Sequence, residues 1–155
     1  MTVEITKFLA QGVIAILGAF LAAHLSTRRF RTEKWWERKA SAYSELVEAL
    51  HHMKWYPSEH IDAAIENREL PDEDKADYWK QYKDARRNVW KIADSASFLV
   101  SPKVNKAIVE MERELGEART AEWWFEHAEQ QYAAIQKCLD QVKGLARQEL
   151  GVKNA

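Results

Sequence analysis

The chain has few of the residues that build disulfides, tight turns or phosphate-binding loops. Its 155 residues include one cysteine, three prolines and five glycines. The lone Cys138 cannot form an internal disulfide, which fits a reducing compartment. Sequences of the form Gly-x-x-x-x-Gly-Lys, Gly-x-Gly-x-x-Gly, His-Glu-x-x-His and Gly-x-Ser-x-Gly are all missing. We therefore predict that the protein is not an enzyme and that it needs no cofactor.

One long stretch carries no charged residue, and the predicted arrangement of the whole chain depends on it. Phe8 to Leu25 is eighteen residues long without Asp, Glu, Lys or Arg. A helix of this length covers ~27 Å, close to the ~30 Å hydrocarbon core of a bilayer. We predict an N-terminal transmembrane helix within an anchor of residues 1–27. A cleaved signal peptide fits less well because small residues do not stand at both −3 and −1 of a cut; a buried core helix is a further alternative.

Basic residues follow this stretch at once. They are Arg28, Arg29, Arg31 and Lys34, whereas only Lys7 and the terminal amine precede it. The positive-inside rule then places the N-terminus in the periplasm of a bacterial inner membrane and residues 28–155 in the cytoplasm. About 120 residues suffice for one compact domain.

The remainder shows helical periodicity and no sustained alternation, so the predicted fold class is all-α: the transmembrane helix continues into an antiparallel helical bundle. Pro57 and Ser58 are expected to end a first helix that begins near Thr6. Further helices are predicted over 59–68, 72–100, 102–115 and 121–150. Ser101 is expected to cap the fourth helix, with Pro102 at its first position and Gly116 at its end, and Gly151 is expected to cap the last.

Apolar residues at alternating spacings of four and three predict the faces that form the core. The first helix has two such rows: Trp36, Ala40, Tyr43, Val47 and Leu50, and Ala42, Leu46, Ala49, Met53 and Tyr56. The row of the helix 72–100 is Tyr78, Tyr82, Ala85, Val89, Ile92, Ala96 and Leu99. The rows of the last two helices are Val104, Ile108, Met111 and Leu115, and Trp124, Ala128, Gln131, Ile135, Cys138, Val142 and Leu145.

A strip that mixes basic and aromatic residues follows the apolar stretch. It contains Arg28, Arg29, Arg31, Lys34, Trp35, Trp36, Arg38 and Lys39. Charge and ring stacking together hold anionic lipid or single-stranded nucleic acid, so these residues are candidates for ligand binding. The alternative is that Trp35 and Trp36 pack against a second pair, Trp123 and Trp124.

Two other patterns have simpler explanations than chemistry. Glu48 and His51 match half of a Glu-x-x-His di-metal motif, but the sequence has no second copy, and we predict no metal site. Cys138 lies on an apolar face, where a small buried hydrophobic residue is the usual explanation and a reactive thiol the alternative.

Within the apolar stretch, Gln11, Ala15, Gly18 and Ala22 share one helix face. Small residues let spanning helices approach closely, and a Gln gains by pairing with another Gln across an interface. We therefore predict a homo-oligomer whose interface or pore is lined by this face. The alternative is that Ala and Gly are simply common in spanning helices.

The join of the apolar stretch to RFRTEKWWERKASAYSELVEALH, Arg29 to His51, resembles small single-span bacterial membrane proteins. In layout it is similar to membrane effectors of anti-phage defence such as the Hailong-type channel effector. The resemblance covers about the first third of the chain. It implies a helical oligomer that disturbs the membrane under control of a nucleotide or oligonucleotide made by a companion signalling enzyme.

The sequence thus suggests an oligomeric membrane effector or channel. The competing hypothesis is a non-enzymatic membrane tether or scaffold. It would recruit a protein partner through the acidic segment Glu59 to Asp77, which holds eight acidic residues against Arg68 and Lys75.

Overall fold

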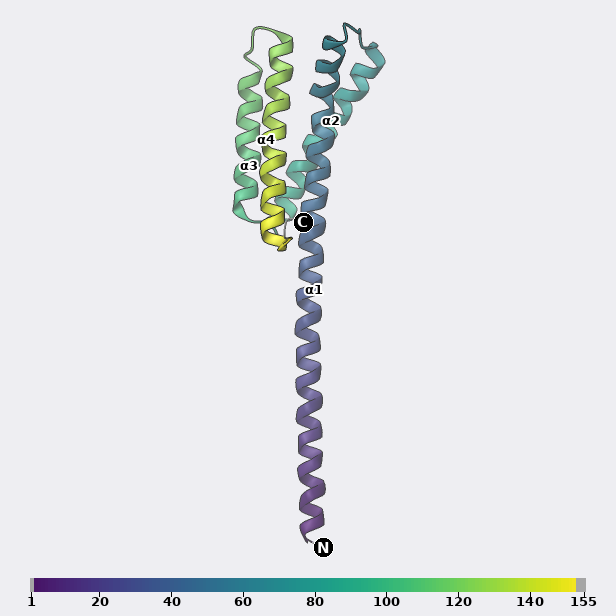
Figure 1. Cartoon of the computed structure of the whole chain (residues 1–155), viewed down its shortest axis with the longest axis vertical. Helices are drawn as coiled ribbons and strands as arrows, with labels where there is room; N and C mark the ends of the chain where they lie inside the picture. The colour runs from purple at the N-terminus through teal and green to yellow at the C-terminus, as the bar shows by residue number, and fades with distance from the viewer. Residues whose placement is uncertain (1, 153–155) are drawn as a thin grey trace. The chain divides into compact units, whose positions relative to one another are not determined.

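The computed structural model describes the backbone of residues 2–152 and the side chains of residues 26, 30 and 32–152. The chain divides into two units, residues 1–37 and 38–155. Four helices follow one another: α1 (Thr2–Ile65), α2 (Asp72–Ser95), α3 (Pro102–Ala118) and α4 (Trp124–Leu150) (Figure 1). No strand is present in the described backbone, which confirms the predicted all-α bundle.

The predicted span and its face of Gln11, Ala15, Gly18 and Ala22 lie outside the residues whose side chains are described. Among the residues whose side chains are described, no helix has enough length and apolar character to cross a membrane.

The sequence predicted that the first helix ends at Pro57, and this prediction is wrong. Helix α1 continues to Ile65 and includes most of the segment 59–68, which was predicted to be a separate helix. Proline inside a helix removes one backbone hydrogen bond and costs ~3 kcal/mol. Here Pro57 is itself buried, and so are Met53 before it and Ala63 after it, at 0% and 4% exposed. The burial of side chains before and after the proline offsets this cost.

The end of α1 is set instead by Asn67. This residue has a positive φ of 50°, and the amide of Arg68 donates to the Ala63 carbonyl at 2.8 Å. A left-handed residue that closes such a bond is a common C-terminal stop, and Asn tolerates this conformation better than most residues.

The other helix ends are close to their predicted positions. Helix α2 stops at Ser95 and turns through Ala96 to Val100, and α3 passes Gly116 because Leu115 and Ala118 on either side are buried. Gly151 caps α4 with φ 68°, as predicted. Pro102 stands in the first turn of α3, also as predicted.

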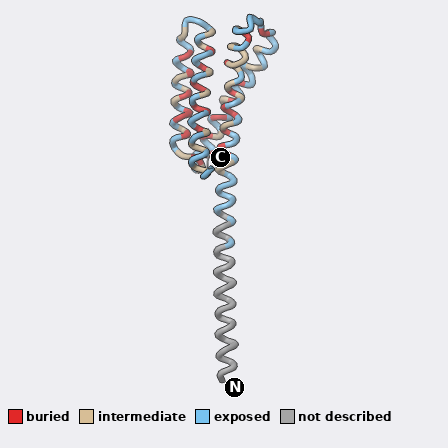
Figure 2. Tube along the Cα trace, in the orientation of Figure 1, coloured by how far each residue is buried: buried red, intermediate tan, exposed pale blue. Residues whose placement is uncertain are grey.

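The core of unit 38–155 lies where helices α1 to α4 face each other, and it runs along the inner faces of all four (red in Figure 2). Most of the predicted faces are confirmed: Leu46, Leu50, Val89, Ile108, Ile135 and Val142 are 0% exposed. The prediction is wrong for Trp36 and Trp124, which are 50% and 60% exposed. Trp36 precedes the bundle unit, and Trp124 opens the first turn of α4.

Candidate functional site: a polar cluster at the first turns of the bundle

The predicted ligand strip lies only partly within the described side chains. The side chains of Arg28, Arg29 and Arg31 lie outside the described residues, whereas Lys34 pairs with Glu37 at 2.7 Å on the exposed surface of α1. Arg38 is exposed, but Lys39 is 21% exposed and reaches a carboxylate of α4. Lys39 therefore forms an ion pair within the bundle, in addition to any role in ligand binding.

The two tryptophan pairs belong to different units of the chain. Trp35 and Trp36 lie in unit 1–37, whereas Trp123 and Trp124 lie in unit 38–155, where they are 71% and 60% exposed. Packing of one pair against the other therefore stays a prediction. Within its own unit, Trp124 meets the ring of Phe125 edge to face, with 5.8 Å between ring centroids.

Lys39 belongs to a group that we name the junction cluster: Lys39 and Tyr43 of α1, Ser101 before α3, and Glu149 in the last turn of α4. Lys39 Nζ lies 2.7 Å from Glu149 Oε2, and both side chains are largely shielded, at 21% and 17% exposed. Tyr43 is 1% exposed. Three segments that are far apart in the sequence thus meet at a charged pair.

The polar atoms of the junction cluster are closed off from solvent. Tyr43 Oη, Ser101 Oγ and Glu149 Oε2 are all inaccessible, so their partners are one another and Lys39 Nζ. Ser101 occupies the N-cap position of α3 without making the side-chain cap that the sequence predicted, since its hydroxyl is buried in this cluster. A buried polar group left unsatisfied costs about 1–3 kcal/mol. Removing one member of the cluster therefore imposes this cost on the neighbours that remain.

Burial and the contacts within the cluster shift the pKa values of Tyr43 and Glu149. Burial raises the pKa of Tyr43 above its ordinary range, and the nearby Glu149 carboxylate adds to the effect. Burial would also raise the pKa of Glu149, but Lys39, Ser101 and Tyr43 outweigh it, so the net pKa is lowered. At neutral pH the Glu149 carboxyl is thus ionised and the Tyr43 phenol is neutral.

A first prediction follows from this arrangement. Glu149→Gln should destabilise the chain by about 1–2 kcal/mol at pH 7, because Lys39 loses its anionic partner. A carboxyl whose pKa is lowered by folding stabilises above its unfolded pKa of 4.5 and loses that contribution as pH falls through the folded pKa. Urea unfolding at pH 7 and below pH 4 should show the difference between parent and variant shrinking in acid. Glu129→Gln, at an exposed position of α4, is the control and should change little.

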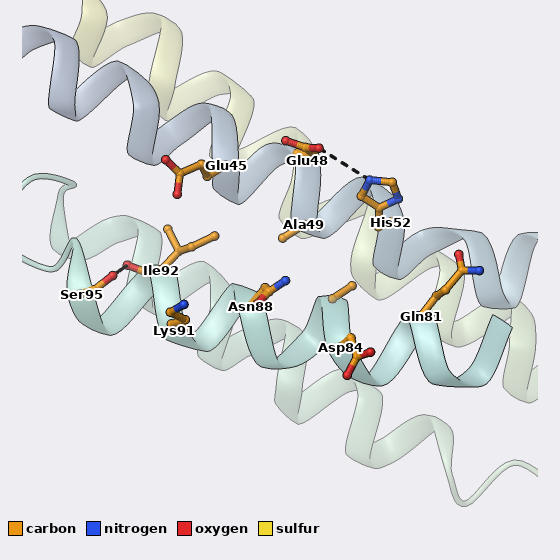
Figure 3. A pocket seen from close by; sticks show the side chains of 11 residues that line it. Glu45, Glu48, Ala49, His52, Gln81, Asp84, Asn88, Lys91, Ile92 and Ser95 are labelled. Carbon is orange, nitrogen blue, oxygen red and sulfur yellow. Dashed lines mark hydrogen bonds and ion pairs between the residues drawn. The ribbon is translucent and has the colours of Figure 1, made fainter. Parts of the chain in front are cut away.

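A groove lies between α1 and α2, and Glu48 and His52 are part of its lining (Figure 3). It encloses about 580 Å³, with Ala49 and Ile92 between the helices. Its polar lining comprises Glu45, Glu48, His52, Gln81, Asp84, Asn88, Lys91 and Ser95. The groove is open to solvent between the two helices.

The groove does not assemble metal ligands. His52 Nε2 lies 3.8 Å from Glu48 Oε1, while His51 is exposed and its ring is edge-on to Trp55. Across the described side chains, no three His, Cys, Asp or Glu residues converge on a common point. Glu48 and His51 thus lie on the helix as surface residues.

Cys138 is 1% exposed in the core. Burial raises its pKa to about 12, with the charges of Glu114 and Glu112 adding to the shift. A thiolate is the nucleophilic form of cysteine, so this thiol is inert at neutral pH. The interpretation as a small buried hydrophobic residue is confirmed.

Sequence reasoning named Lys39 but missed Tyr43, Ser101 and Glu149 as its neighbours. Tyr43 was assigned to the core by periodicity, and Ser101 was assigned to a helix cap. The available signals were a tyrosine on a buried face and a glutamate in the last turn of a predicted helix. No family model, curated protein or solved structure matches the chain.

Proposed function

We propose that this chain is an oligomeric single-span membrane effector, of the kind used in bacterial anti-phage defence. Residues 8–25 cross the inner membrane, and the cytoplasmic bundle responds to a nucleotide or oligonucleotide ligand made by a companion signalling enzyme. Several copies associate through Gln11, Ala15, Gly18 and Ala22, because one spanning helix alone encloses no path. In this function the chain catalyses no reaction and acts by changing the permeability of the membrane.

The observation that carries the proposal is the junction cluster. It joins the last turn of α4 to α1 only two residues after the boundary between units 1–37 and 38–155. A shielded charged pair surrounded by other polar groups responds strongly to the loss of one partner, because an uncompensated charge is then left away from water. A signal received by the bundle can thus be passed to α1 through Lys39 and Glu149.

Topology provides the first test. A reporter fused after Ala155 should be active in the cytoplasm, and one fused before Met1 should be active in the periplasm. Replacing Arg28, Arg29, Arg31 and Lys34 by Gln should mix the two orientations. A C-terminal reporter active only in the periplasm would overturn the arrangement.

A second candidate function is the membrane tether. The acidic residues around the α1–α2 turn favour it, since Asp72, Glu73, Asp74 and Asp77 are all exposed at the start of α2. Such a surface suits a basic protein partner. The tether needs neither an oligomer nor a membrane leak. Leakage of a membrane-impermeant dye from cells that express the chain separates the two functions.

A further inference from the structure

A second cavity, of about 310 Å³, lies among all four helices of the bundle unit. It is lined by Tyr56 of α1, Trp79 and Tyr82 of α2, Leu115 and Arg119 at the end of α3, and His127 and Gln131 of α4. We name this the aromatic pocket. Its volume is at the lower end of the range for small-molecule sites, so it suits a single compact molecule.

Three aromatic rings form one wall of the pocket. Trp79 and Tyr82 stack with 5.3 Å between centroids and 11° between planes, and Tyr56 lies 5.2 Å from Trp79. Tyr82 is 3% exposed, whereas Trp79 is 41% exposed at the rim. A fixed inner ring beside an accessible outer ring offers a stacking surface for a flat guest.

The opposite side of the pocket carries an amide that the fold leaves incompletely paired. Gln131 is 6% exposed, and it is the one polar residue among the buried residues of the described chain. Its Oε1 atom has no hydrogen-bond partner. The terminal torsion of Gln rotates through a broad range, so this amide can present either its oxygen or its nitrogen to a guest.

His127 next to it has a fixed tautomer. Its Nδ1 lies 2.6 Å from the Ala118 carbonyl, and a carbonyl only accepts, so Nδ1 carries the proton. Nε2 is therefore the ring nitrogen that remains to meet a ligand.

Arg119 supplies positive charge to the pocket. Two guanidinium groups, Arg86 and Arg119, lie close enough to Tyr82 to act on its pKa, which burial raises to about 12. Arg86 is held by both oxygens of Glu112. Arg119 is exposed and forms no ion pair within the described residues. It is the cation that an incoming acid can engage.

From these features we infer that the aromatic pocket binds a small planar aromatic anion. The flat ring lies against Trp79 and Tyr82, polar ring atoms meet Gln131 and His127, and the acidic group pairs with Arg119. Nucleoside monophosphates and aromatic carboxylates share this chemistry. The inference deepens the proposed function, since it gives the bundle a place to receive a signal, but binding is measured without reference to the membrane.

Calorimetric titration of the full chain in detergent tests the inference. The probes are AMP, GMP, CMP and UMP in one arm and indole-3-carboxylate in the other. At least one should bind with a Kd below 1 mM (a threshold of roughly −4 kcal/mol). Binding by nucleotides alone, or by the carboxylate alone, supports the site and identifies the source of the ligand.

Arg119→Gln should weaken binding at least about tenfold, because a charged hydrogen bond is lost. Arg87→Gln is the matched control, since Arg87 has an 82% exposed side chain on α2 and does not line the pocket. Gln131→Leu should also weaken binding while leaving the melting temperature unchanged or raised, because the unpaired amide is removed.

Failure of every probe to bind at 1 mM would overturn the inference, and so would an affinity that Arg119→Gln leaves unchanged. Should Gln131→Leu fail to fold, the Arg119→Gln comparison decides the result alone. If the chain permeabilises membranes but binds none of these probes, the proposed function stands and ligand binding in the aromatic pocket is overturned. If the chain binds the probes without any membrane effect, the pocket stands and the proposed function is overturned.

Discussion

Val142→Asp should unfold the helical bundle at temperatures where the parent is fully folded. Val142 is 0% exposed and belongs to a core cluster that draws on all four helices. An unpaired carboxylate there costs several kcal/mol, against a total stability of about 5–15 kcal/mol for a typical domain. Thermal unfolding followed by circular dichroism should show the midpoint falling by more than 10 °C, or no folded baseline at all.

The control for this prediction is the same substitution at an exposed valine. Val109 lies on α3 and is 56% exposed. Val109→Asp should therefore shift the midpoint by only a few degrees, since surface changes are usually within about 0.5 kcal/mol. Equal melting of Val142→Asp and the parent would show that the core assignment is wrong.

Gly18→Leu should abolish the oligomer and the membrane effect together. Gly18 lies on the predicted face of Gln11, Ala15 and Ala22, where small residues allow close approach of neighbouring helices. Leucine adds bulk at the interface, yet it is at least as favourable in a membrane as glycine, so the segment still inserts. Size measurement in detergent should show a smaller species, while membrane fractionation should show the same amount of chain.

Gly12→Leu is the matched control. Gly12 is about 100° from Gln11 around a helix, on a different face of the same segment. It should leave subunit number and leakage unchanged. If both leucine variants behave like the parent, this face does not set the assembly.

Periodicity predicted the core because burial and the helical repeat are the same physical constraint. The spacing of Tyr82, Ala85 and Val89 marks one face of a helix, and the structure buries all three. Local stop signals were less reliable. Pro57 was outweighed by packing on both sides, and Asn67, which does end α1, was passed over because one Asn is a weak signal by itself.

The sites depend on contacts between distant segments, which no local pattern encodes. Lys39 meets Glu149 from 110 positions away, and Tyr56 meets Trp79 and Tyr82 across a turn between helices. The sequence marked Lys39 as basic and Tyr56 as apolar, but the partner that gives each its role is visible only in the folded bundle.

Dye leakage from cells that express the full chain, with and without its neighbouring genes, tests the central claim most directly. Under the effector account the parent permeabilises the membrane, Gly18→Leu does not, and Glu149→Gln alters the response to the signal while the chain remains folded. Under the tether account leakage is absent, Gly18→Leu changes nothing, and reversing Asp72, Glu73 and Asp74 to Lys abolishes partner recruitment. A parent that never permeabilises the membrane, whether alone, overexpressed or with its trigger, would contradict the effector account.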